Sequence, residues 1–212
     1  MSKKHIAILT ILLAIIVDQI VKIYVKTHFT IGEEGQIKVF DWFRIHFVEN
    51  NGMAMGIEFG GRAGKLFLTL FRLVAVAGII YWLLNTIKKK MPTIVVIAIA
   101  LIFAGAVGNI VDSVFYGVIF SESNPYTVAT MFPEQGYGSL FHGKVVDMFY
   151  FPIIDSTWPE WVPIVGGEPL KFFNYIFNPA DAYITCGVAL LFIFSKKAFP
   201  KEEKKVEEGV TD

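Results

Sequence analysis

Four long apolar runs are the dominant feature of the chain. Each meets the requirement of about 20 mostly apolar residues for a helix that crosses the hydrocarbon core of a bilayer. The runs cover residues 5–25, 65–87, 91–111 and 172–194, and the last has its continuous apolar part at 182–194. This pattern predicts an α-helical integral membrane protein with four transmembrane helices.

Lysines cluster at the ends of these runs, and all the clusters fall on one side of the membrane if the four helices alternate in direction. The clusters are Lys3 and Lys4, then Lys88, Lys89 and Lys90, then Lys196, Lys197, Lys201, Lys204 and Lys205. Because lysine-rich ends stay in the cytoplasm, we predict that both termini are cytoplasmic and that the long connections 27–64 and 112–171 lie outside. The first run lacks a small-residue cleavage site, so we interpret it as a retained helix.

The composition supports a membrane protein and argues against nucleic acid as a partner. Of the 212 residues, 54% are hydrophobic, and the mean hydropathy is +0.55. The formal net charge is zero, which removes any overall attraction to nucleic acid. The single cysteine, Cys186, excludes an intrachain disulfide and a paired-cysteine metal site. We predict one membrane-embedded domain over residues 1–200 and a disordered cytoplasmic tail over 201–212.

The two outer connections differ in what their patterns predict. In residues 38–49, apolar side chains recur at alternate positions, which is typical of a strand with one apolar face. We therefore predict a small outer sheet that rests on the membrane, followed by a flexible link or a short surface helix at 56–64. The connection 112–171 is long and aromatic, which argues against disorder, but its pattern does not predict a fold.

Ionisable and amide side chains inside apolar runs are costly unless they are paired or face water. Asp18 and Lys22 are four residues apart on one helix face, so they can form an anchoring ion pair or take a chemical role. Asn109 and Asp112 follow small residues at 105–108 that allow close helix approach. These two side chains fit either of two roles, structural hydrogen bonding or catalysis.

Asp147 and Asp181 are the main candidates for catalysis. Large apolar residues flank Asp147, and Asn178 can cap the last helix so that Asp181 falls in its first turn. Each aspartate alone fits a structural role. Both are expected at the outer edge of the bilayer, where two neighbouring carboxylates cannot easily ionise together. One can then activate water while the other protonates a departing amide, as in aspartic proteases, with no metal or cofactor.

Other chemistries have weaker support in the sequence. Ser139 and His142 suggest a serine mechanism, but both lie in one loop rather than on separate spans. A proton-coupled transporter component could use intramembrane aspartates as a relay, and it would spread them through the bilayer depth. A membrane scaffold without catalysis is a third alternative.

Five motifs occur in order along the chain, and together they resemble the lipoprotein signal peptidase (signal peptidase II) family. Asp18 with Lys22 resembles the Asp-x-x-x-Lys pattern of the first helix. Residues 50–56 resemble Asn-x-Gly-Ala-Ala-Phe, residues 108–112 resemble Gly-Asn-x-x-Asp-Arg, residues 143–148 resemble Gly-x-Val-x-Asp-Phe, and residues 177–181 resemble Phe-Asn-x-Ala-Asp.

This resemblance implies a fold, a reaction and a set of site residues. The fold would be four transmembrane helices with a small extracytoplasmic β-sheet, the cradle, and a short outer helix. Asp147 and Asp181 would be catalytic. The residues that would bind substrate or support the pair are Asn50, Gly52, Asn109, Asp112, Asn178, Asp18 and Lys22.

The resemblance also implies partners and a location. The enzyme would be a monomer in the bacterial inner membrane, among membrane lipids. It would cleave the signal peptide of a diacylglyceryl-modified prolipoprotein before the lipidated cysteine, and the cyclic peptide globomycin would inhibit it.

Two departures from the family pattern stand out. Ser113 occupies the place of the family's arginine after Asp112, so Arg44 or Lys144 is a candidate for that contact. The chain also carries additional residues at about 118–142 and at 152–172, and both additions enlarge the outer portion.

Overall fold

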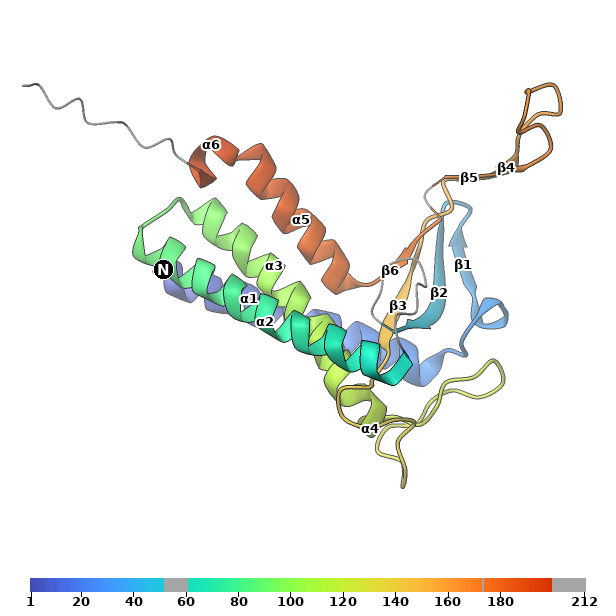
Figure 1. Cartoon of the computed structure of the whole chain (residues 1–212), viewed down its shortest axis with the longest axis horizontal. Helices are drawn as coiled ribbons and strands as arrows, with labels where there is room; N and C mark the ends of the chain where they lie inside the picture. The colour runs from blue at the N-terminus through green and yellow to red at the C-terminus, as the bar shows by residue number, and fades with distance from the viewer. Residues whose placement is uncertain (52–60, 173, 200–212) are drawn as a thin grey trace, which may run out of the picture.

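The computed structural model describes residues 1–51, 61–172 and 174–199, with the side chains of residues 155 and 171 excepted. Four helices run side by side, and a sheet lies at the end of them away from the N-terminus (Figure 1). We call this the sheet end, and the opposite end the lysine end. The main helices are α1 (Lys3–His28), α2 (Gly61–Lys88), α3 (Thr93–Val111) and α5 (Pro179–Ile193), and the short ones are η1 (Glu33–Gly35), η3 (Asp112–Tyr116), α4 (Gly117–Ile119) and α6 (Ser195–Ala198).

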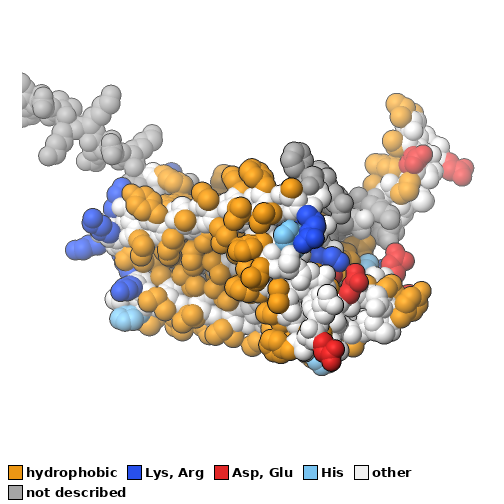
Figure 2. Space-filling view, turned by 60° about the horizontal axis from the view of Figure 1, so that its bottom comes forward, with side chains coloured by type: hydrophobic (Ala, Val, Ile, Leu, Met, Phe, Trp, Pro, Cys, Tyr) orange, Lys and Arg blue, Asp and Glu red, His pale blue; other side chains and the backbone are white. Residues whose placement is uncertain are grey.

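Three stretches of helix have the length and composition of membrane spans. Three stretches, Lys3–His28, Gly61–Lys88 and Thr93–Ile119, are long and apolar enough to cross a bilayer, and Pro179–Ile193 is a shorter apolar helix. Hydrophobic side chains cover the outside of the helical part, and lysines gather at its lysine end (Figure 2). Because such a surface is stable only against hydrocarbon, the chain is a multi-pass membrane protein.

The fourth expected span needs a correction at its start. The expected range of 172–194 overlaps β5 (Pro169–Phe172) and β6 (Ile176–Phe177), and the helix begins only at Pro179. Asn178 ends the extended segment because its side chain caps the helix and Pro179 fixes the first helical turn.

The third span is also longer than expected. Helical backbone continues through η3 and α4 to Ile119, so the connection begins there and not at Asp112. Loop residues satisfy the carbonyl groups of this extension, since Gly143 N–H donates to Ser113 O at 2.9 Å and Phe141 N–H donates to Val114 O at 3.0 Å.

Helix α3 is the centre of the bundle and packs against α1, α2 and α5. The small residues of α3 allow neighbouring helices to approach closely, as the sequence predicted. A Cβ atom at Gly105 would overlap the backbone oxygen of Ala180, and one at Gly108 would overlap the carboxylate of Asp18. Glycine at both positions therefore brings α1 and the start of α5 against the same part of α3.

The antiparallel sheet has the strand order β1-β2-β3-β6. Its first strands are β1 (Ile37–Phe40) and β2 (Phe43–Asn50), and β3 covers Val145–Tyr150. Residues 38–49 thus form a hairpin and not the single strand that was expected, because Asp41 and Trp42 form a turn. The register places Val48 opposite Asp147, so the sheet fixes the depth of this aspartate.

The additional residues have two different structures. The segment 120–142 folds back on itself, with Phe120 bridged to Met131, and it packs against the sheet. The second addition forms the hairpin of β4 (Ile154–Thr157) and β5, which projects from the sheet (Figure 1). The short outer helix expected at 56–64 lies mostly outside the described residues, and from Gly61 onward the chain belongs to α2.

Candidate active site

Asp147 and Asp181 come to the same place from two elements. Asp147 lies within β3, an inner strand of the sheet that is almost wholly buried. Asp181 lies in the first turn of α5. The strand and the helix start are adjacent because β6, which leads into α5, pairs with β3.

Asn178 explains why α5 starts where it does. Its Oδ1 accepts the backbone N–H of Asp181 at 3.0 Å, and Asp181 Oδ2 accepts the backbone N–H of Asn178 at 3.3 Å. This reciprocal capping box satisfies two N–H groups that no helical carbonyl could reach.

The same asparagine connects the two aspartates. Its Nδ2 donates to Asp147 Oδ1 at 2.6 Å, while Asn50 donates to the other oxygen of Asp147. Asn109 Nδ2 donates to Asp181 Oδ1 at 2.8 Å. Amide groups from β2, α3 and the cap of α5 therefore hold both carboxylates in fixed orientations.

The environment of Asp147 favours a bound proton. The residue is only 3% exposed. Burial, followed by the nearby charge of Asp181, raises the pKa of the Asp147 carboxyl to about 7. A carboxyl group with this pKa keeps a proton near neutrality, so the pair can hold one proton between two carboxylates.

A buried ion cluster supports the site from the helix side. Lys22 Nζ lies 3.0 Å from Asp18 and 2.9 Å from Asp112, and all three side chains are buried. Lys22 also donates to Asn109 Oδ1 at 2.8 Å, and Asp18 accepts the backbone N–H of Ala180 at 2.9 Å. The pairing expected for Asp18 and Lys22 is confirmed, and it orients both Asn109 and the start of α5.

Arg44 and Lys144, which were suggested in place of the family arginine, contact Gln36, Tyr150 and Glu49. In the described part of the chain, Arg44 donates to Gln36 at 3.3 Å and lies over the ring of Tyr150. Lys144 pairs with Glu49 at 3.5 Å. Ser113 donates to the backbone oxygen of Asn109 at 2.9 Å, as part of the helix extension. Gly52 lies outside the described residues.

Gln19 was not identified from the sequence, and Arg72 was predicted only to reach the membrane interface. Gln19 Nε2 donates to Asp18 and to Asp112, each at 3.0 Å, and Gln19 Oε1 accepts the Tyr116 hydroxyl. The sequence feature that could have identified Gln19 is its position next to Asp18 in an apolar run. Arg72 lies in α2, and its charge interacts with Asp181 and Asp147.

Metal binding has no visible support in residues 1–51, 61–172 and 174–199. No group of three or more His, Cys, Asp or Glu side chains there has an arrangement that could hold an ion.

Comparisons with known proteins agree on one family. A family model described as signal peptidase (SPase) II matches residues 10–197. A lipoprotein signal peptidase of Porphyromonas gingivalis is 45% identical over 211 residues, which cover 95% of this chain and 89% of that protein. A lipoprotein signal peptidase of Amoebophilus asiaticus is 34% identical, over 92% of this chain and 80% of that protein.

The fold is likewise similar to a solved structure. A bacterial membrane enzyme determined by the in meso method at 1.9 Å resolution matches with a TM-score of 0.59 and 25% identity. The match covers 91% of this chain and 94% of that one. With the family match over most of the chain, the conclusion is that this protein belongs to the lipoprotein signal peptidase (signal peptidase II) family of membrane proteases.

Proposed function

We propose that this protein is an aspartic endopeptidase that cleaves diacylglyceryl-modified prolipoproteins immediately before the lipidated cysteine. The family supports the cleavage of lipoprotein signal peptides. The single observation that carries the aspartic mechanism is the shared contact of Asp147 and Asp181 with Asn178. That contact supports a pair of carboxylates that act together on a substrate from the membrane.

The proposed mechanism uses one proton shared by the two aspartates. Asp181, as the ionised carboxylate, takes a proton from a water molecule while the water oxygen attacks the scissile carbonyl carbon. Asp147 gives its proton to the amide nitrogen as the C–N bond breaks. The products are a signal peptide with a new carboxylate and a lipoprotein with a free amino group on its cysteine.

The surrounding residues have positioning roles in this proposal. Asn50, Asn109 and Asn178 orient the carboxylates, and the buried cluster of Asp18, Lys22 and Asp112 fixes the elements that carry them. Because amide donors are held by burial and by one another, little reorganisation is needed when charge moves during the reaction.

The depth of the site fits a lipid-anchored substrate. The pair lies where the sheet meets the helices, and acyl chains keep a lipidated cysteine at the surface of a bilayer. We propose that the sheet end faces the outside of the inner membrane, that both termini are cytoplasmic and that the four helices all span. The lysine clusters at the other end favour this orientation. We further propose that the enzyme is a monomer and that globomycin occupies the site.

The test is cleavage of a lipidated prolipoprotein in detergent, with and without globomycin. Asp147→Asn and Asp181→Asn should each abolish cleavage, and thermal unfolding in detergent should show that both variants are folded. Asp41→Asn is the matched control, because Asp41 is exposed in the turn between β1 and β2. Cleavage that survives in both single variants at the site would reject the mechanism.

A further inference from the structure

A cavity of about 560 Å³ lies beside the active site and has no part in the mechanism above. Its walls come from the first turns of α2, the segment 122–142 and the residue that precedes β3. Neither Asp147 nor Asp181 lines it. The additional segment therefore builds one wall of a separate pocket at the sheet end.

The polar lining of the cavity is predominantly basic. Its charged side chains in the described part of the chain are Arg62, Lys65, Lys144 and Glu122. Arg62 donates to Ser139 at 3.2 Å and Lys65 donates to Asn51 at 3.0 Å, and these neutral partners hold the cations without neutralising them. Arg62 and Lys65 therefore favour an anion such as a phosphate, and Lys144, which also pairs with Glu49 at 3.5 Å, adds a third positive charge to the cavity wall.

Glu122 gives the cavity a second kind of contact. It is exposed and lines the same cavity as the three cations. A cavity with several cations and one carboxylate fits a group that carries a phosphate and an ammonium close together. A phosphoethanolamine headgroup has this charge pattern.

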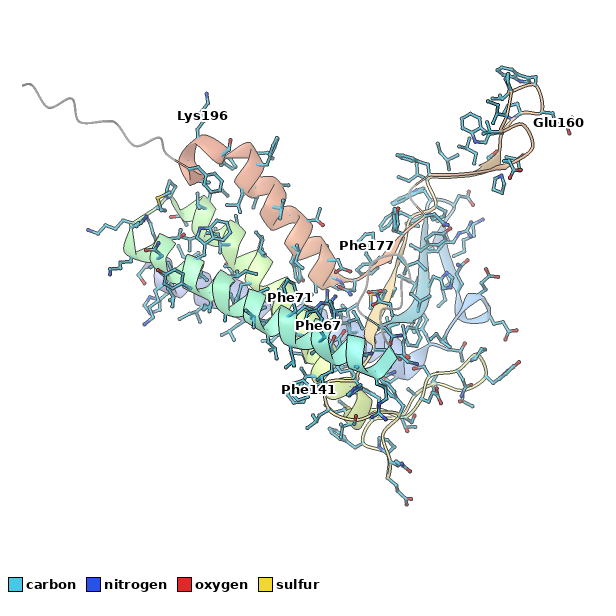
Figure 3. All side chains as sticks on the ribbon, in the orientation of Figure 1. Phe67, Phe71, Phe141, Glu160, Phe177 and Lys196 are labelled. Atoms are coloured by element: carbon cyan, nitrogen blue, oxygen red, sulfur yellow. The ribbon has the colours of Figure 1, made fainter. Side chains whose placement is uncertain are left out.

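The cavity also adjoins an apolar surface that would contact lipid. Phe67 and Phe71 lie one turn apart on α2, and they are 67% and 61% exposed. Figure 3 shows both side chains on α2 near Phe141, which precedes the cavity residue His142. An amphipathic ligand could therefore place its head in the cavity and its acyl chains along this part of α2.

We propose that this cavity binds the phosphoethanolamine headgroup of a phospholipid from the leaflet at the sheet end. Arg62, Lys65 and Lys144 contact the phosphate, and Glu122 contacts the ammonium. The acyl chains lie along Phe67 and Phe71. A soluble acidic peptide would satisfy the cations but would leave the apolar surface and Glu122 without a role.

The test is native mass spectrometry of delipidated, detergent-solubilised protein titrated with phosphatidylethanolamine or phosphatidylglycerol. The wild type should retain one phosphatidylethanolamine at least tenfold more tightly than phosphatidylglycerol. The double variant Arg62→Gln/Lys65→Gln should lose both lipids. Glu122→Gln should lose the preference for phosphatidylethanolamine. Lys38→Gln, an exposed site on β1, is the matched control and should bind as the wild type does.

Several results would overturn the proposal. Equal retention of both lipids by the wild type would remove the role of Glu122. Displacement of the lipid by millimolar inorganic phosphate or by an acidic peptide would identify a soluble ligand instead. Unchanged binding in the double variant would show that the lipid lies elsewhere. If the double variant unfolds, the exposed Glu122→Gln variant still decides the outcome. Because the readout is lipid binding, the result is independent of the aspartic mechanism.

Discussion

Asn178 and Asp147 are joined by a hydrogen bond of 2.6 Å from Nδ2 to Oδ1, across the junction of helix and sheet. The Oδ1 atom of the same asparagine caps α5 at Asp181. One amide side chain thus fixes the helix start and orients the aspartate on the strand. The two aspartates lie close together because the cap uses only the oxygen of Asn178, and its Nδ2 group donates to Asp147.

Asn178→Ala should lower lipoprotein cleavage by about 100-fold, because both aspartates lose an orienting contact and small misplacements are costly in catalysis. The lost cap should cost only about 1 kcal/mol of stability. The measurement is the initial cleavage rate together with the unfolding temperature. Asn174→Ala is the control, since the Asn174 side chain contacts Tyr150. A drop in stability large enough to explain the whole loss of activity would contradict a positioning role.

The stability of the protein should depend on pH through Asp147. Its pKa is raised from 3.8 to about 7, so the folded state binds this proton more tightly than the unfolded state. The resulting stability is present below about pH 4 and is lost as the pH rises toward 7. Asp147→Asn never ionises, so it does not lose this stability. Relative to the wild type, its unfolding temperature should rise between pH 5 and pH 8, by about 2–4 °C for each kcal/mol that the wild type loses.

The control for this pH series is Asp41→Asn. The Lys38 ammonium holds the pKa of Asp41 below its usual range, so Asp41 stays ionised from pH 5 to pH 8. The difference between this variant and the wild type should not change with pH. A constant difference for Asp147→Asn as well would mean that Asp147 is ionised throughout and would remove it as the proton donor.

Lys22→Met should destabilise the protein by about 3–5 kcal/mol, because it leaves the carboxylates of Asp18 and Asp112 buried without their cation. Thermal unfolding in detergent measures this loss, and Lys4→Met at the exposed start of α1 is the matched control. Adding Asp112→Asn to Lys22→Met should recover part of the stability. No recovery would show that Lys22 acts through packing and not through its charge.

Glu49→Gln should release the segment 120–142 from the sheet. Glu49 Oε1 accepts hydrogen bonds from Lys26 and, at 2.9 Å, from Ser123, and Lys26 lies under the rings of Phe120 and Tyr137. Losing the carboxylate leaves a buried lysine without its counter-ion. Limited proteolysis should then cut within 120–142 faster than in the wild type. Glu33→Gln, which is exposed, should not change the cleavage pattern.

Some of these features were predictable because they depend on neighbours along the chain. The apolar runs predicted the helices α1, α2 and α3, and the four-residue spacing of Asp18 and Lys22 predicted their ion pair. The sequence Asn178-Pro179 predicted a cap. The error over 38–49 arose because alternation continues through the two-residue turn at Asp41, so periodicity alone could not separate two strands from one.

The sequence by itself determined the apolar helices, their lysine ends and the two aspartates, because burial in lipid and helix capping are set by residues within a few turns. Only the tertiary structure decided which polar groups meet. Lys22 contacts Asp112, Asn109 contacts Asp181 and Glu49 contacts Ser123 across separations of more than 70 residues. Such contacts follow from how α3 packs between its neighbours and from the register of β2 against β3, and neither is encoded locally.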